Sequence, residues 1–108
     1  MDVREYREAS GLSPFAVWFR ALDSPAAVRV DVALRRLELG NTSNVKGVGA
    51  GVFELKVDFG PGYRVYFGKD GNEIVILLGG GSKKRQQRDI KAAQGRWQDY
   101  KDRKKGKV

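Results

Sequence analysis

The sequence predicts an α+β fold: a short N-terminal strand, an α-helical hairpin, an antiparallel β-meander of three to four strands, and a basic C-terminal helix. Three observations predict it. Apolar residues recur three and four positions apart before residue 40, they alternate with polar residues between 52 and 67, and helical spacing returns after residue 82. With 108 residues, the chain is long enough for one two-layered core but not for a second domain. We therefore expect a single domain over residues 1–108.

The first 40 residues are expected to form an edge strand and two helices. Residues 2–8 alternate in the manner of a short strand. Ser13 precedes Pro14 as a capping residue, and Pro25 follows a similar signal, so each proline begins a helix. Gly40 ends the second helix, because glycine readily adopts the left-handed conformation found after helix C-termini. The apolar stripes of the two helices are Phe15, Trp18, Phe19 and Leu22 in the first, and Ala27, Val30, Leu34 and Leu37 in the second.

A sheet follows a polar, glycine-rich segment at 41–51, which is expected to be a loop. Alternation over 52–59 and again over 63–67 predicts two strands joined by a Gly-Pro-Gly turn. Residues 73–78 are apolar on both faces, which is typical of a strand covered on both sides. The glycines at 79–81 are expected to end the sheet. The core face of the first two strands carries Phe53, Leu55, Val57, Phe59, Tyr63, Val65 and Phe67.

The net charge of +8 lies entirely in the last 26 residues. From Lys83 onward there are 11 Lys/Arg against three Asp, whereas residues 1–82 hold ten residues of each sign. Such a segment is typical of a protein that meets a polyanion, because Lys and Arg displace condensed counterions from phosphates. The alternative is a solvated basic tail. A helix capped by Ser82, with a stripe of Ile90, Ala93, Trp97 and Tyr100, favours a folded segment that frays after residue 103.

Composition excludes several kinds of site. The chain has no cysteine and no histidine, which argues against disulfides, a zinc site and a Ser-His-Asp triad. No signal sequence and no membrane-spanning apolar run is present, so we expect a cytoplasmic protein without a metal or cofactor. The GGGSKK segment at 79–84 lacks the spacing of a nucleotide-binding P-loop. Its glycines are expected to let the chain leave the strand.

The polar face of the sheet gathers the residues that could carry chemistry. Because paired residues of a hairpin share a face, Glu54, Lys56, Arg64 and Tyr66 must cluster opposite the core, with Lys56 across from Arg64 or Tyr66. The segment after the third strand brings Lys83 and its neighbours to the sheet edge. The alternative is a solvated polar face held by cross-strand ion pairs. Trp18, Phe19, Trp97 and Tyr100 are expected in the core.

Two motifs resemble the RelE/ParE superfamily of toxins from type II toxin–antitoxin systems, and in particular its HigB-like addiction module killer proteins. The first is GVFELKVDFGPGYRVYF at 51–67, and the second is ILLGGGSKKRQQRDI at 76–90, followed by WQDY at 97–100. The resemblance covers nearly the whole chain. It implies a RelE-like fold, a small helix-turn-helix antitoxin as partner, and ribosome-dependent, metal-independent cleavage of mRNA that inhibits translation.

The resemblance, read with the chemistry of RNA cleavage, suggests roles for the clustered side chains. An arginine at the strand position of Arg64 lies in the family's active site, where its planar guanidinium would bind the phosphate. Proton transfer would fall to Glu54, Lys56, Tyr66, or to Lys83 and Lys84, without the histidines of some HigB relatives. The cations expected to contact mRNA or ribosomal RNA are Lys46, Arg85, Arg88, Lys91 and Arg96.

Two other functions remain open from the sequence. A ParE-like inhibitor of DNA gyrase would have the same fold without enzymatic activity, but the cations of the sheet face argue against it. A basic nucleic-acid-binding module without catalysis would need exposed aromatic side chains on the sheet, and only Tyr66 qualifies.

Overall fold

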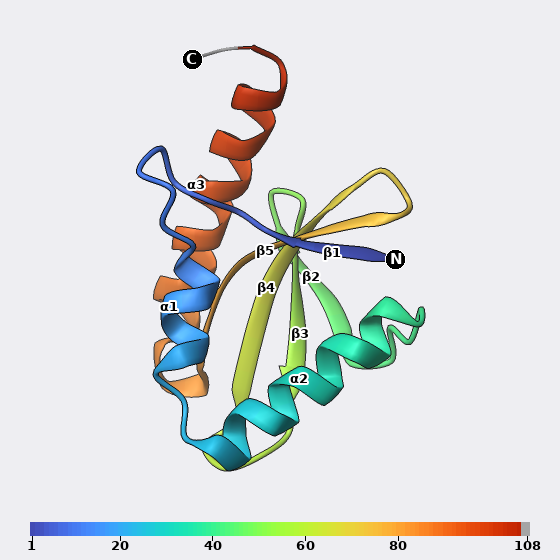
Figure 1. Ribbon diagram of the computed structural model, residues 1–108, viewed down its shortest axis with the longest axis vertical. Coiled ribbons are helices and arrows are strands. Elements are labelled where there is room, and N and C mark those ends of the chain that lie inside the picture. The colour runs from blue at the N-terminus through green and yellow to red at the C-terminus, as the bar shows by residue number, and fades with distance from the viewer. Residues whose placement is uncertain (107–108) are drawn as a thin grey trace.

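A computed structural model describes residues 1–106 as one α+β domain built around a five-stranded mixed sheet (Figure 1). The order of strands across the sheet is β1-β5-β4-β3-β2. The edge strand β1 runs parallel to β5, and the other neighbours are antiparallel. The elements in chain order are β1 (Asp2–Glu5), α1 (Pro14–Arg20), α2 (Ser24–Glu38), β2 (Val45–Gly49), β3 (Val52–Val57), β4 (Tyr63–Asp70), β5 (Ile74–Ser82), the 3-10 turn η1 (Lys83–Arg85) and α3 (Gln86–Lys104).

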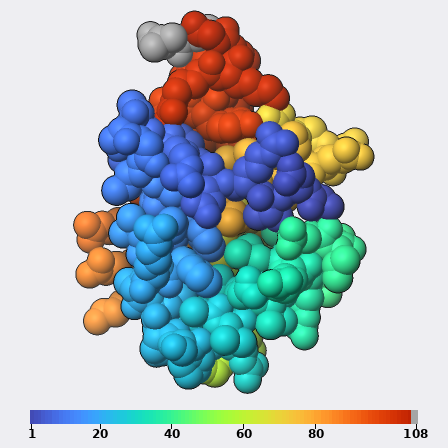
Figure 2. Space-filling model, viewed as in Figure 1, coloured from blue at the N-terminus to red at the C-terminus, as the bar shows by residue number. Residues whose placement is uncertain are grey.

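Helices cover both faces of the sheet. The α1–α2 pair covers the face seen in Figure 2, where little of the sheet is visible between the helices and the N-terminal strand. On this side Val30, Leu37, Val65 and Phe67 are buried, as the alternation predicts. On the opposite face α3 packs Ala93 and Trp97 against the sheet, with Ile90 and Tyr100 partly buried beside them. The predicted stripe of the C-terminal helix is therefore confirmed.

The N-terminal helices begin and end where the sequence predicts. The Ser13 hydroxyl accepts a hydrogen bond from the Ala16 amide at 3.1 Å, and the Asp23 carboxylate accepts one from Ala26 at 2.9 Å. Gly40, at φ +91°, follows α2. The two helices diverge from their short link, so that α1 packs on β5 and α2 on β3 (Figure 1).

Several sheet boundaries differ from the prediction, including the ends of the strands expected at 2–8, 52–59 and 63–67. The expected loop at 41–51 contains β2, which pairs with β3 and places Lys46 opposite Glu54. Its glycines hide the alternation on which a strand prediction depends. The expected end of the sheet at residues 79–81 is also wrong, because β5 continues through Ser82. The chain shifts register against β4 between Tyr66 and Phe67, which bulges β5 near Leu78.

The glycines of β5 let both helix layers approach the sheet closely. A Cβ atom on Gly80 would lie 2.3 Å from the Trp18 ring of α1, and one on Gly81 would clash with the Asp89 carboxylate of α3. In β4, a Cβ atom on Gly68 would lie 2.4 Å from the Trp97 ring. Because these glycines have no side chains, helix residues can lie directly against the strands at these positions.

The C-terminal helix begins later and ends later than expected. Ser82 makes no side-chain capping bond, and η1 precedes α3, which starts at Gln86. At the other end α3 continues to Lys104, where fraying is predicted from residue 103, and the last two residues of that run lie outside the described residues. Two tyrosine hydroxyls hold the C-terminal half of α3 in place by hydrogen bonds: Tyr6 donates to Asp99 at 2.7 Å, and Tyr100 donates to Asp70 at 2.6 Å. In the described part of the chain, no helix is long and apolar enough to span a bilayer.

Replacing Gly68 with alanine should destabilise the protein, because the added methyl group overlaps the Trp97 ring. We expect the free energy of unfolding to fall by about 1–3 kcal/mol, as for overpacked cores. Gly47→Ala is the matched control, since nothing lies within 4 Å of a Cβ at that strand position. Urea unfolding of both variants checks this. Equal stabilities would contradict the packing of Trp97 on Gly68.

Candidate functional site

The predicted polar side chains do share one face of the sheet. Of the two partners expected for Lys56, the structure pairs it with Arg64, and Glu54 pairs with Tyr66. Their expected exposure is wrong for three of the four. Only 2% of Glu54, 7% of Arg64 and none of Tyr66 is exposed, because the first turns of α3 lie over this face. The expected open cationic surface is therefore a buried polar cluster with cations at its margin.

The Glu54 carboxylate is the centre of this cluster. Gln86, the first residue of α3, donates a hydrogen bond from Nε2 to Glu54 Oε1 at 2.7 Å. Arg64 Nε lies 3.6 Å from the same oxygen, and Lys46 Nζ lies 3.6 Å from Oε2. Two cations and one amide therefore surround a single buried negative charge. A carboxylate oxygen accepts hydrogen bonds and donates none, so these three neighbours match it.

Arg64 holds donors that the protein does not satisfy. Its Nε and Nη1 atoms are buried and find no hydrogen-bond acceptor within residues 1–106. The side chain is 8% exposed, and a Cβ atom on Gly62 would lie 3.3 Å from Nη1. Arg64 lines a pocket of about 280 Å³ together with Asn44, Lys46 and Lys56. We call it the Arg64 pocket. A buried guanidinium with unused donors, flanked by two lysines, is suited to a phosphate oxygen.

Tyr66 supports the cluster from below. Its ring is fully buried against Ala93 and Trp97, and its buried hydroxyl makes no hydrogen bond within the described residues. Burial raises the pKa of this phenol, and the negative charges of Glu54 and Asp89 raise it further. Tyr66 is consequently a neutral phenol at physiological pH. Because it is fully buried, Tyr66 offers no exposed aromatic surface to a base, so the non-catalytic nucleic-acid-binding module loses the one exposed aromatic side chain it would need.

The basic residues near the start of α3 divide into two groups. Lys83 joins the margin of the cluster, because its amide donates to Gly62 O at 3.0 Å, beside Arg64. The expected solvent exposure of Arg96 is wrong: this half-buried side chain donates from Nη1 to Leu78 O at 3.0 Å, which ties α3 to β5. The remaining predicted cations are exposed and lie on η1 or α3; they are Lys84, Arg85, Arg88 and Lys91.

Two residues of this site have no signal in the sequence pattern. Gln86 bonds the central carboxylate, but nothing in a run of basic and amide residues distinguishes it. Asp89 lies over Gly81, and burial raises the pKa of its carboxyl although Arg85, Arg88 and Arg96 oppose the shift. In the sequence, Asp89 is only one of three acidic residues that reduce the net charge of the basic segment. Its place over Gly81 depends on how α3 packs on β5, which the sequence pattern does not show.

The cluster offers no metal-binding arrangement. Within residues 1–106, no three acidic, histidine or cysteine side chains gather closely enough to hold an ion. What the site does combine is a buried carboxylate, an arginine with unused donors, and exposed lysines at its edge. This set can accept a proton, bind an oxyanion and donate a proton.

Comparisons with known proteins place this architecture among phage-related sequences. Residues 17–98 match the family model described as "Phage derived protein Gp49-like (DUF891)". These residues run from α1 to α3 and include the whole polar cluster. An uncharacterized protein of Haemophilus influenzae (strain ATCC 51907 / DSM 11121 / KW20 / Rd) is 41% identical over 80 residues, which are 73% of this chain and 81% of the relative.

Replacing Asp89 with asparagine should change how stability depends on pH. Because burial raises the folded-state pKa of Asp89 above its unfolded-state value, the folded protein binds this proton more tightly. The ionised carboxyl therefore lowers stability above the folded-state pKa, and that penalty disappears as the pH falls below the unfolded-state value. Asparagine does not titrate. We therefore expect the stability of wild type to rise relative to that of the Asp89→Asn variant as the pH falls from 7 to about 4. Chemical unfolding across that range measures the difference, and parallel pH profiles would contradict the assignment.

Proposed function

Because this chain belongs to the Gp49-like family of phage-derived proteins, we propose that it is the toxin of a type II toxin–antitoxin system that cleaves mRNA on the ribosome. The family is toxin-like and related to RelE and HigB. The specific activity is our proposal, and one observation carries it. Arg64 is buried beside the Glu54 carboxylate, and two of its own donors make no hydrogen bond within residues 1–106. Lysines line the pocket that it borders.

The proposed reaction is attack of a ribose 2′-oxygen on the adjacent phosphorus. The new O2′–P bond forms as the P–O5′ bond breaks, which leaves a 2′,3′-cyclic phosphate and a 5′-hydroxyl. The 2′-OH must lose a proton, the phosphorane must be stabilised, and the 5′-oxygen must gain a proton. No metal ion is needed if side chains serve all three tasks.

The geometry of the cluster suggests how its residues share these tasks. Arg64 would bind the non-bridging oxygens, which supply the acceptors that its Nε and Nη1 atoms lack in the protein. Glu54 would accept the 2′ proton at Oε2, the oxygen that faces Lys46 and not Gln86. Lys46, Lys56 and Lys83 border the same site and are the candidates for protonating the leaving oxygen. Lys84 is exposed on η1, and we assign it to RNA phosphates.

The exposed cations of η1 and α3 support a nucleic-acid partner for the same face. Arg85, Arg88 and Lys91 lie beside the cluster and form no ion pair with a carboxylate of residues 1–106. We propose that they contact ribosomal RNA and mRNA, which would position the scissile phosphate at Arg64. A helix-turn-helix antitoxin would neutralise the protein.

Expression of the protein without an antitoxin tests this proposal. We expect growth to stop and translated transcripts to acquire new 5′ ends inside their reading frames, detectable by primer extension. Purified protein should cleave the same RNA poorly unless ribosomes are added. Intact transcripts together with loss of DNA supercoiling would instead indicate a ParE-like gyrase inhibitor.

The substitution Arg64→Met should remove toxicity while the protein still folds, because methionine fills the buried space without the guanidinium. Loss of one preorganised contact to a transition-state oxyanion lowers the rate by about 10²–10³-fold. The control is Arg20→Ala, which removes an exposed arginine from α1, across the sheet from the cluster. Circular dichroism and ribosome-dependent cleavage are the measurements. A folded Arg64→Met protein with full activity would refute the role of Arg64.

A further inference from the structure

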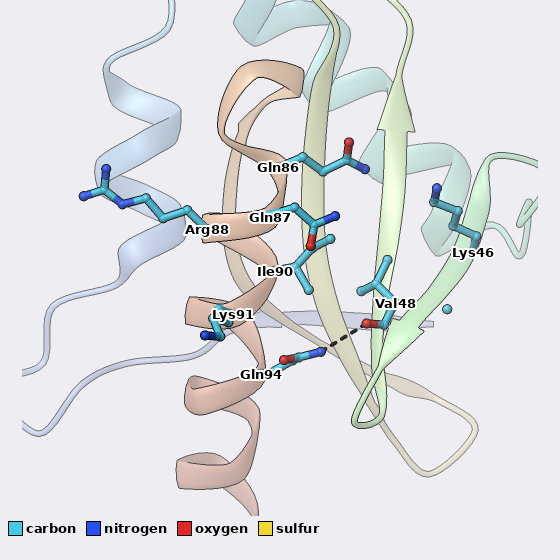
Figure 3. A pocket seen from close by; sticks show the side chains of 9 residues that line it. Lys46, Val48, Gln86, Gln87, Arg88, Ile90, Lys91 and Gln94 are labelled. Carbon is cyan, nitrogen blue, oxygen red and sulfur yellow. Dashed lines mark hydrogen bonds between the residues drawn. The ribbon is translucent and has the colours of Figure 1, made fainter.

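A second hollow adjoins the Arg64 pocket. It runs between β2 and the first turns of α3 and has a volume of about 690 Å³ (Figure 3). We call it the β2–α3 groove; the residues that matter here are Lys46, Val48, Gln86, Gln87, Ile90 and Gln94. Lys46 lines both this groove and the Arg64 pocket. The two hollows therefore share one cation.

The groove has an apolar floor. Val48 of β2 and Ile90 of α3 point toward each other across it (Figure 3). Both side chains are only partly buried at the margin of the core under α3, so their outer surfaces remain accessible. Facing aliphatic side chains of this kind can hold the flat face of an unstacked base.

Amide side chains line the α3 wall. Two of them are engaged: Gln86 donates to Glu54 at one end, and Gln94 donates to Val48 O at 3.1 Å at the other. Gln87 lies between them, points into the groove, and makes no side-chain hydrogen bond within residues 1–106 (Figure 3). A glutamine amide offers one acceptor and two donors, which is the pattern that reads the edge of a nucleobase.

The charge of the groove favours nucleic acid as its occupant. Lys46, Arg88 and Lys91 contribute to its lining, and none of the lining residues is Asp or Glu. In Figure 3, Arg88 and Lys91 extend from α3 away from the floor, where they can meet a backbone that enters from solvent. An unstacked base would match the apolar floor and the Gln87 amide, and the phosphates beside it would match the cations.

We propose that the β2–α3 groove holds one unstacked nucleobase of single-stranded RNA, next to the phosphate bound at Arg64, and that Gln87 determines which base is accepted. This inference rests on the proposed function, since it takes Arg64 as the phosphate site. Gln94 closes the far end of the groove through its bond to β2, and Gln86 links the base subsite to Glu54.

NMR titration of the purified chain tests occupancy without any cleavage. The probe is a non-cleavable 2′-O-methyl RNA hexamer of mixed sequence, with inorganic phosphate as the comparison. We expect the RNA to shift the Gln87 side-chain amide and the Val48 and Ile90 methyl resonances, whereas phosphate alone does not. The side-chain amide resonance of Gln98, which bonds Asp102 on the exposed side of α3, should not shift. Shifts that phosphate reproduces, or that only a copurified protein partner produces, would overturn the proposal.

Mapping of cleavage sites tests the role of Gln87 in specificity. In cells that express Gln87→Ala, we expect cutting at the preferred sequence to fall about tenfold relative to other sites, as for loss of one base-reading side chain. Gln98→Ala is the matched control and should keep the wild-type profile. An unchanged profile in Gln87→Ala and in Gln87→Trp, which fills the groove, would refute the inference. If wild type yields no new 5′ ends while the hexamer still shifts Gln87, the proposed reaction fails and the base subsite stands.

Discussion

The close packing of α3 on the sheet is the constraint on which the rest of the structure depends. A helix reaches this distance only because the strands beneath it lack side chains at the contact points, as where Trp97 lies on Gly68 and Asp89 lies on Gly81. Once α3 is in place, it covers Glu54 and Tyr66, supplies Gln86 to the central carboxylate, and forms one wall of the β2–α3 groove. The glycines thus determine the architecture of the candidate site.

Burial of charge under α3 has an energetic consequence for the cluster. A buried ion pair stabilises a protein only when its remaining donors and acceptors are satisfied. Glu54 accepts one hydrogen bond, from Gln86, and its two ion pairs, with Lys46 and Arg64, are 3.6 Å long, whereas two donors of Arg64 have no acceptor within residues 1–106. In the proposed reaction, a phosphate oxygen at Arg64 would supply those acceptors. The unsatisfied donors would then lower folding stability in exchange for anion binding.

Alternation in the sequence was sufficient to predict the pairing at the centre of the site. The buried partners Val65 and Phe67 require one face, so Lys56 must lie across from Arg64 or Tyr66, and the structure selects Arg64. Burial of the other face could not be predicted in the same way, because Glu54 and Arg64 are residues that normally lie in solvent. The alternation also failed to predict the strands at Gly47 and Gly80, because glycine has no side chain to show which face of the sheet a position occupies. What decides these positions is contact with distant helices, and contacts of that kind leave no local periodicity.

Parallel pairing of β1 with β5 affects when this protein can fold during its synthesis. The first strand waits for a partner that begins at Ile74, more than half the chain later, and Tyr6 waits longer still for Asp99. Pairings between such distant segments form slowly, because the intervening chain must be ordered first. The wall that Gln86 and Gln87 provide is translated after the strands that carry Glu54 and Arg64. A nascent chain therefore has no complete cluster until α3 has been synthesised.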